Sequence, residues 1–195
     1  FQTVSRRAHF MGSALSAALS AIDIALWDIL GKSVGLPVYQ LLGGKCRDKV
    51  KVYGNLGGQT DAEIAAAARS GLEQGYTAFR MTPFPANFEL RNATSNISAG
   101  TRMVAAARAA LGDEIDLGIE IHRNLRPEEA ITLARELEPF KIHYYEDPVA
   151  PQSVEALEYV ARHVNIPIAT GERFYSLYQF KDLIDRQIVS LIRPD

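Results

Sequence analysis

From Val50 to its last residue, the chain alternates short apolar runs with helical patterns, and this alternation constrains the fold more than any other feature. The apolar runs predict strands at residues 50–53, 77–82, 115–122, 142–147, 167–172 and 189–193. The helical patterns predict helices at residues 61–74, 98–111, 127–140, 153–164 and 177–186. A chain that alternates strands and helices in this way builds a parallel α/β sheet covered by helices.

A closed barrel fits this alternation better than an open, doubly wound sheet. Polar residues recur at the carboxyl ends of successive strands, where barrel enzymes place their chemistry. No Gly-x-Gly-x-x-Gly motif follows the first strand, so the strongest sign of a dinucleotide-binding sheet is missing. Because a complete TIM-type barrel has eight strands and roughly 250 residues, we expect six strands here and about two further strand-helix units downstream.

A different pattern precedes the barrel region. Residues 13–31 are apolar around almost the whole circumference of a helix, and Gly31 is well placed to end it. We expect this helix either to pack between two bodies or to be a plain core helix. A second, shorter helix is expected to begin near Pro37 and to end at Gly43.

Charge and composition exclude several kinds of partner. The formal net charge of the 195-residue chain is −2 and its Lys and Arg are scattered, so neither nucleic acid nor anionic membrane is an expected partner. The single cysteine, Cys46, cannot form an internal disulfide, which favours a reducing, cytoplasmic setting. We expect no membrane span, since no apolar run approaches roughly 20 residues, and no signal-peptide core follows the first residues. Because the first residue is not Met, we expect further residues upstream.

Three glutamates recur with the same spacing at the ends of expected strands. Intervals of 26 residues separate Glu120 from Glu146 and Glu146 from Glu172. The carboxyl ends of neighbouring parallel strands meet at one rim, so we expect the three carboxylates to lie together. A salt bridge could satisfy one buried carboxylate, but it is a strained explanation for three. Oxygen ligands at this density select a hard cation, and we expect Mg²⁺.

The strand expected at residues 115–122 shows which side chains face inward. Four isoleucine and leucine side chains alternate with polar ones along it, and the apolar set suits the helix layer. The other face carries Asp116, Gly118, Glu120 and His122, which would point into the barrel. A long polar connection at residues 83–96 follows the preceding strand, at the end where functional loops lie.

Several motifs resemble the mandelate racemase and muconate lactonizing branch of the enolase superfamily. They are the helix at residues 16–28, the Pro-Val-Tyr-Gln-Leu-Leu-Gly-Gly segment at 37–44, Tyr-Glu-Asp-Pro at 145–148 and Thr-Gly-Glu-Arg at 170–173. The resemblance implies an α+β capping domain, with residues 1–49 as its C-terminal helices, and a (β/α)₇β barrel whose first six strands occupy residues 50–195. It also implies one Mg²⁺ per subunit, a base that removes the proton next to a substrate carboxylate, and a homo-oligomer.

Two departures from the family pattern bear on the reaction. The ligand on the third strand is usually Asp, whereas this chain has Glu120, whose longer side chain would move the ion or alter its coordination. Many relatives carry Lys-x-Lys on the second strand, whereas this chain reads Arg80-Met81-Thr82. Because arginine stays protonated, Arg80 is a poor base; we expect it and Thr82 to contact the substrate, with Arg80 as a clamp in the catalytic site.

The remaining site residues are expected from the same resemblance or from their position beside the ligands. The acid-x-His spacing of Glu120 and His122 is similar to that of acid-sugar dehydratases, in which the histidine is the general acid for the departing β-hydroxyl. In the family, the residue at the position of Asp195 orients a histidine base on the seventh strand; the alternative is that Asp195 is a turn residue at the strand end. Arg123 is expected to contact the substrate. Asp147 and Arg173, beside two of the ligands, are expected to support them.

The reaction expected from these residues is the Mg²⁺-dependent dehydration of an acid sugar. The substrate would be a small-molecule hexonate such as galactonate, mannonate or gluconate, and the product a 2-keto-3-deoxy acid. Two alternatives remain open: another reaction of the superfamily, such as racemisation or cycloisomerisation, and a non-catalytic barrel with a binding role.

Overall fold

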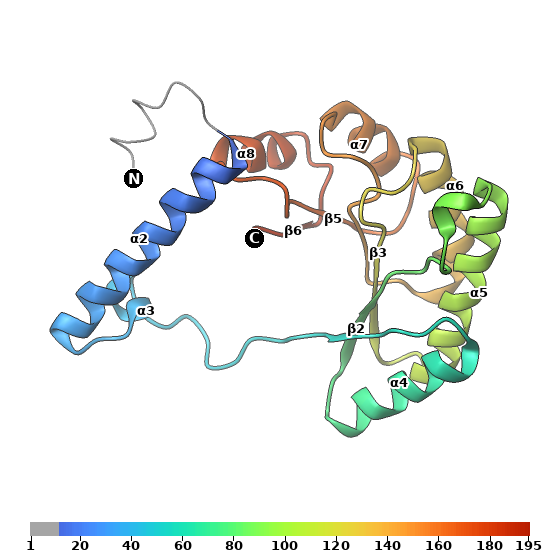
Figure 1. Ribbon diagram of the computed structural model, residues 1–195, viewed down its shortest axis with the longest axis horizontal. Coiled ribbons are helices and arrows are strands. Elements are labelled where there is room, and N and C mark those ends of the chain that lie inside the picture. The colour runs from blue at the N-terminus through green and yellow to red at the C-terminus, as the bar shows by residue number, and fades with distance from the viewer. Residues whose placement is uncertain (1–11) are drawn as a thin grey trace.

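The computed structural model describes residues 12–195. The expectation that no signal-peptide core follows the first residues concerns a segment outside this range. Its centre is a six-stranded sheet in which all neighbours are parallel and the spatial order equals the chain order (Figure 1). The strands are β1 (Gly54–Asn55), β2 (Ala78–Met81), β3 (Asp116–Glu120), β4 (Tyr144–Glu146), β5 (Ile168–Thr170) and β6 (Leu191–Ile192). This order is the one that successive strand-helix units produce in a barrel wall.

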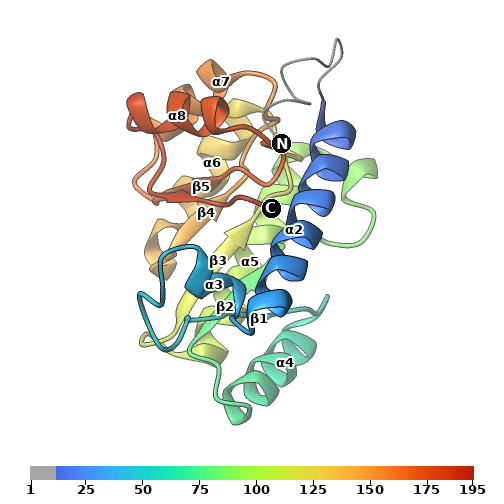
Figure 2. The ribbon, with the colours of Figure 1, turned by 90° about the vertical axis from the view of Figure 1, so that its left-hand side faces the viewer.

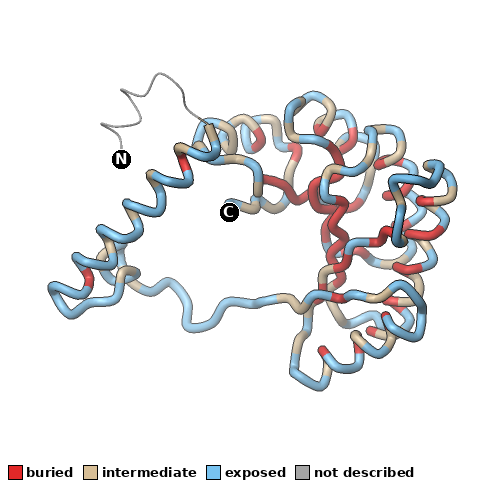
Figure 3. Tube along the Cα trace, viewed as in Figure 1, coloured by how far each residue is buried: buried red, intermediate tan, exposed pale blue. Residues whose placement is uncertain are grey.

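Helices connect the strands and cover one face of the sheet (Figure 1). They are α4 (Asp61–Glu73), α5 (Ala93–Leu111), α6 (Pro127–Leu137), α7 (Val154–Ala161) and α8 (Leu177–Asp185), with short 3₁₀ turns η1 (Phe88–Leu90) and η2 (Glu138–Phe140). Leu117 and Ile119 of β3, and Ile121 directly after it, are fully buried in the core between strands and helices. Figure 3 shows this buried layer running along the strands.

Most expected elements occur, with shifted ends. The first strand was expected at residues 50–53, but only Gly54–Asn55 pair with β2, through Phe79 and Arg80. Helix α5 begins at Ala93 rather than near residue 98, because the Asn92 side chain accepts a hydrogen bond from the Ser95 N–H and caps the helix there. The expected long connection at 83–96 is correspondingly shorter and contains η1.

The N-terminal helices differ from expectation in where they end. Helix α2 (Ser13–Val34) continues past Gly31 and is capped by Gly35, whose φ of 69° is the left-handed conformation that glycine adopts without strain. Gly31 is instead a packing position, where a Cβ atom would lie 2.7 Å from the Leu36 carbonyl oxygen. The chain turns back here into α3 (Val38–Leu41).

Helix α2 is much more exposed than its apolar sequence predicts. Only Ser16 and Gly31 are buried within it, whereas Ile22, Ile24 and Ile29 are each more than half exposed. Figure 1 shows α2 set apart from the sheet, on the side away from α4 to α7, and Figure 2 views the molecule from the side on which α2 lies. The expected burial does not occur within residues 12–195, where only Ser16, near its start, and Gly31, beside Leu36, are buried in α2.

By length and composition alone, α2 is also the one described helix that could cross a membrane. The expectation that no apolar segment approaches the roughly 20 residues of a membrane span is therefore contradicted, because α2 spans 22 residues. The same test is passed by core helices of proteins without membrane spans, so it carries little weight by itself.

Candidate metal centre

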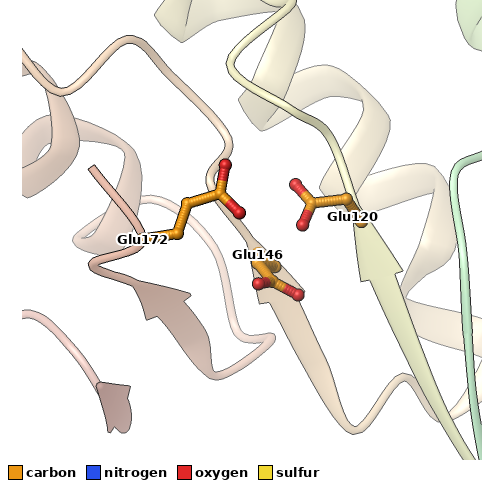
Figure 4. Close-up of side chains that lie close together, drawn as sticks. All are labelled: Glu120, Glu146 and Glu172. Atoms are coloured by element: carbon orange, nitrogen blue, oxygen red, sulfur yellow. The ribbon is translucent and has the colours of Figure 1, made fainter. Parts of the chain in front are cut away.

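The three equally spaced glutamates meet at the carboxyl ends of three neighbouring strands (Figure 4). Glu120 is the last residue of β3 and Glu146 the last of β4, and the two face each other in the strand register. Glu172 lies two residues beyond β5. One carboxylate oxygen from each residue lies within 4.8 Å of the other two. The structure thus brings together the three side chains that the spacing predicted.

A glycine turns the chain so that Glu172 reaches this cluster. Gly171 has a φ of 135°, a conformation that other residues rarely adopt, and a Cβ atom there would lie 2.6 Å from the Phe180 ring. The strand was expected to continue to Glu172, but it ends at Thr170, and this turn re-aims the side chain toward β4.

Burial shapes the electrostatics of the two strand-end glutamates. The side chains of Glu120 and Glu146 are completely buried. Burial raises the pKa of Glu146 to about 7, and the nearby charge of Glu120 adds to this. Burial also raises the pKa of Glu120, opposed by the hydrogen bond that its Oε1 accepts from the His122 N–H at 2.7 Å. Charged forms of both therefore need nearby cations.

Two arginines provide positive charge beside this pair. Arg80 Nη1 lies 3.3 Å from Glu120 Oε2 and 3.5 Å from Glu146 Oε2, and Arg193 Nη1 lies 3.0 Å from Glu146 Oε2. Both guanidinium groups lie near the Tyr53 ring. Arg193 and Tyr53 were not predicted as site residues. The signal for Arg193 was a charged residue directly after the apolar pair Leu191 and Ile192 of an expected strand.

A third arginine bridges the other side of the cluster. Arg123 Nη1 donates to Asp147 Oδ2 at 2.5 Å and to Glu172 Oε1. Burial alone would lower the pKa of Arg123, but its bonds to Glu172 and Asp147 raise it. Asp147 is buried with a φ of 44°, and its Oδ1 accepts a hydrogen bond from the Thr170 hydroxyl at 2.5 Å. Asp147 therefore holds Arg123 beside Glu172, and its expected role in supporting the ligands stays a prediction.

The donor set fits a hard divalent cation. All three candidate ligands are carboxylates, which Mg²⁺ prefers. Glu146 Oε1 is buried and has no hydrogen-bond partner among residues 12–195. A buried carboxylate oxygen without a partner is costly, and a bound cation would satisfy it. Glu120, Glu146 and Glu172 would be the residues that hold the ion.

His122 and Thr82 lie at the open side of the cluster. The strand was expected to include His122, but β3 ends at Glu120 and His122 has a φ of 52°. Its Nδ1 nevertheless lies 3.4 Å from Thr82 Oγ1, and its Nε2 lies 4.0 Å from Glu120 Oε2. The His122 side chain is 42% exposed, so a substrate can reach it.

Two other expected site residues line a neighbouring cavity. Arg173 and Asp195 are both exposed, and each lines a cavity of about 690 Å³ between α2 and the segment that follows β5. Glu172 lines the same cavity, so the cavity adjoins the metal centre. Asp195 lies three residues beyond the end of β6.

Family models match most of the chain. Residues 63–195 match the model described as enolase C-terminal domain-like, and residues 2–43 match the N-terminal domain of mandelate racemase and muconate lactonizing enzyme. Residues 44–62 lie in neither match, and the domain boundary expected between residues 49 and 50 stays a prediction.

Individual relatives agree with these matches. A D-galactonate dehydratase from Variovorax paradoxus is 36% identical over the whole chain, which covers 51% of that protein. The crystal structure of the 3,6-anhydro-D-galactonate cycloisomerase from Zobellia galactanivorans superimposes with a TM-score of 0.86 and 34% identity, covering all of this chain and 53% of that one. An enolase from Pantoea ananatis with bound D-gluconate and Mg has a TM-score of 0.77 and 32% identity, covering 89% and 49%.

The chain spans about half the length of the curated relatives that it matches. The full-length superposition on a solved relative includes α2, so this apolar helix is part of the shared fold. The six parallel strands confirm the expected first part of a (β/α)₇β barrel. Together, the family models, the relatives and the fold show that the chain belongs to the mandelate racemase and muconate lactonizing branch of the enolase superfamily.

Proposed function

We propose that the protein is a Mg²⁺-dependent lyase that dehydrates an acid sugar. The substrate would be a hexonate, with galactonate the first candidate because D-galactonate dehydratases are among the similar proteins. The observation that carries the proposal is the position of His122, an exposed imidazole 4.0 Å from one carboxylate of a three-glutamate cluster. A cation site with an accessible proton donor beside it suits an elimination.

In this proposal Glu120, Glu146 and Glu172 hold one Mg²⁺ per subunit. When bound, the ion stabilises the negative charge that develops on the substrate carboxylate as the neighbouring carbon loses its proton. Support comes from the oxygen-only donor set and from the relative whose crystal structure contains D-gluconate and Mg.

His122 would supply the proton that the leaving group needs. The hydrogen bond between Thr82 Oγ1 and Nδ1 orients the ring and leaves Nε2 for the substrate. Loss of the carbon-bound proton to a base, and transfer of the Nε2 proton to the β-hydroxyl, break the carbon–oxygen bond and release water. The enol that remains becomes the 2-keto-3-deoxy acid. The base would be a histidine of a further strand, oriented by Asp195.

The arginines would favour an anionic substrate. Four carboxylates, those of Glu120, Glu146, Asp147 and Glu172, face three guanidinium groups. A divalent cation would leave the cluster with a net positive charge, which one substrate carboxylate would balance. Arg80, Thr82 and Arg123 lie around this cluster and would contact the substrate, with Arg173 as a supporting residue at its edge.

The proposal is tested with the full-length protein. It is incubated with Mg²⁺ and a library of hexonates, and release of a 2-keto acid is measured, with a sample freed of divalent ions by chelation as the control. We expect product from at least one hexonate and none after chelation. No product from any member of the library would contradict the proposal.

A second candidate reaction is cycloisomerisation, favoured by the similarity to a 3,6-anhydro-D-galactonate cycloisomerase. It begins with a related proton abstraction but releases no water. Mass spectrometry separates the two, because a cycloisomerised product keeps the mass of the substrate, whereas dehydration lowers it by the mass of one water. We further propose a cytoplasmic homo-oligomer that acts on this small molecule in carbohydrate acid catabolism and binds neither nucleic acid nor membrane.

A further inference from the structure

Arg193 is fixed from two sides although it lies beyond the last strand. Its backbone N–H donates to the Thr170 carbonyl at 2.9 Å, so its Cα is tied to the end of β5. Its Nη2 donates to the Tyr53 hydroxyl at 2.9 Å, and its Cζ lies 5.5 Å from the centre of the Tyr53 ring. Tyr53 comes from the segment just before β1, so Arg193 connects the two edge strands of the sheet.

The same guanidinium holds one oxygen of Glu146. Arg193 Nη1 lies 3.0 Å from Glu146 Oε2, and Arg80 approaches this same oxygen to 3.5 Å. The second oxygen, Oε1, is buried and has no partner among the described residues. The two guanidinium groups beside Oε2 therefore restrict rotation of the carboxylate and leave Oε1 as the atom available to a metal ion.

We propose that Arg193, anchored by Tyr53, is a positioning residue that holds Glu146 by Oε2 so that Oε1 faces the metal site. This inference rests on the metal-binding part of the proposed function. Substituting a residue that orients a metal ligand typically lowers metal affinity by about 10- to 100-fold. A purely structural ion pair would contribute to stability but would leave metal affinity unchanged.

Charge-preserving variants separate geometry from charge. Arg193→Lys keeps the positive charge but loses the planar fork that reaches Glu146 and Tyr53 together. Tyr53→Phe keeps the ring and removes only the hydroxyl that anchors Arg193. Arg186→Lys is the matched control, since Arg186 forms ion pairs with Glu158 and Asp182 away from the site.

The measurement is calorimetric titration of Mg²⁺ into the full-length protein, with thermal unfolding of each metal-free variant as a check of folding. We expect Arg193→Lys to bind Mg²⁺ roughly 10-fold more weakly or worse, Tyr53→Phe to weaken binding less, and Arg186→Lys to bind like wild type. In the Arg193→Lys background, Tyr53→Phe should weaken binding no further, because Tyr53 acts through Arg193.

Two results would overturn the inference: wild-type Mg²⁺ affinity in folded Arg193→Lys, or additive losses in the double variant. The proposed activity fails separately. Protein that shows the coupled loss of Mg²⁺ affinity but dehydrates no hexonate retains the role of Arg193 and loses the dehydratase assignment. If the wild-type protein dehydrates a hexonate but the Arg193→Lys variant binds Mg²⁺ normally, the dehydratase assignment stands and the role of Arg193 is refuted.

Discussion

Each of the three glutamates of the candidate metal centre has an arginine side chain beside it. Arg80 contacts Glu120 and Glu146, and Arg123 contacts Glu172. The pairing explains how two buried carboxylates and one partly exposed carboxylate can lie together, because an unpaired buried charge is costly and like charges repel. It also means that Arg80 and Arg123, expected at first as substrate contacts, have a second role in holding the ligands.

Among single residues, His122 gives the sharpest separation between metal binding and chemistry. We expect His122→Asn to lower the rate of dehydration by about 10²- to 10⁴-fold, because the β-hydroxyl loses its proton donor. Mg²⁺ affinity should change little, since the imidazole is not one of the three oxygen ligands. His163→Asn, at an exposed residue just beyond α7, is the matched control. A His122→Asn enzyme with the wild-type rate would refute the general-acid role.

The raised pKa of Glu146 predicts a pH dependence with a defined sign. Its folded-state pKa of about 7 exceeds the ordinary value of 4.5, so metal-free folded protein holds this proton until the pH rises through about 7. Neutral Glu146 therefore contributes fully to stability below about pH 4.5, and this contribution is lost as the pH rises through about 7. Mg²⁺ competes with the proton, so its stabilising effect should grow over the same interval.

Thermal unfolding with and without Mg²⁺, from about pH 5 to about pH 8, checks this prediction. The shift in midpoint caused by Mg²⁺ should increase with pH and level off above about 7. A Glu146→Gln variant should show a flatter dependence. A shift that is constant across the range would contradict the account.

At the scale of elements, the pairing of β3 with β4 depends on a glycine beneath the glutamates. Gly118 faces Tyr144 in the register, and a Cβ atom at Gly118 would lie 2.2 Å from the Tyr144 ring. The ring is buried, which raises the pKa of Tyr144 to about 12. The two strands can therefore bring Glu120 and Glu146 into register only because one position in this layer has no side chain.

Gly118→Ala should lower the free energy of unfolding by about 1–3 kcal/mol, because the Tyr144 ring must move to admit the methyl group. Gly57→Ala is the control, since a Cβ atom there meets nothing within 4 Å. Chemical denaturation of both variants measures the difference. Equal stability of the two variants would show that the Tyr144 ring gives way without cost.

The sequence predicted the type and order of the elements because strand and helix periods are local properties. It predicted the meeting of the three glutamates for the same reason, since equal spacing fixes equal positions in successive units. It missed the turn at Gly171 and the left-handed backbone at His122, which depend on contacts between units. It also missed Arg193 and Tyr53, which come from opposite edges of the sheet and meet only in the folded chain.

At the scale of the whole molecule, the described chain forms one wall of a barrel with its chemistry on one rim. The six strands are parallel and consecutive, so their carboxyl ends, and the residues that follow them, share one side of the sheet. Helix α2 presents far more apolar surface than the described elements cover. Its sequence predicted burial that residues 12–195 alone do not provide, so its surroundings could not be derived from local pattern.

The central claim is that glutamates from three successive units hold one divalent cation. Calorimetric titration of Mg²⁺ into the full-length protein tests it most directly, with Glu172→Gln as the variant and the exposed Glu114→Gln as its control. The account predicts one Mg²⁺ per chain, binding weakened at least about 10-fold by Glu172→Gln, and no change in Glu114→Gln. Absence of binding to the wild-type protein, or equal affinity in wild type and Glu172→Gln, would contradict it.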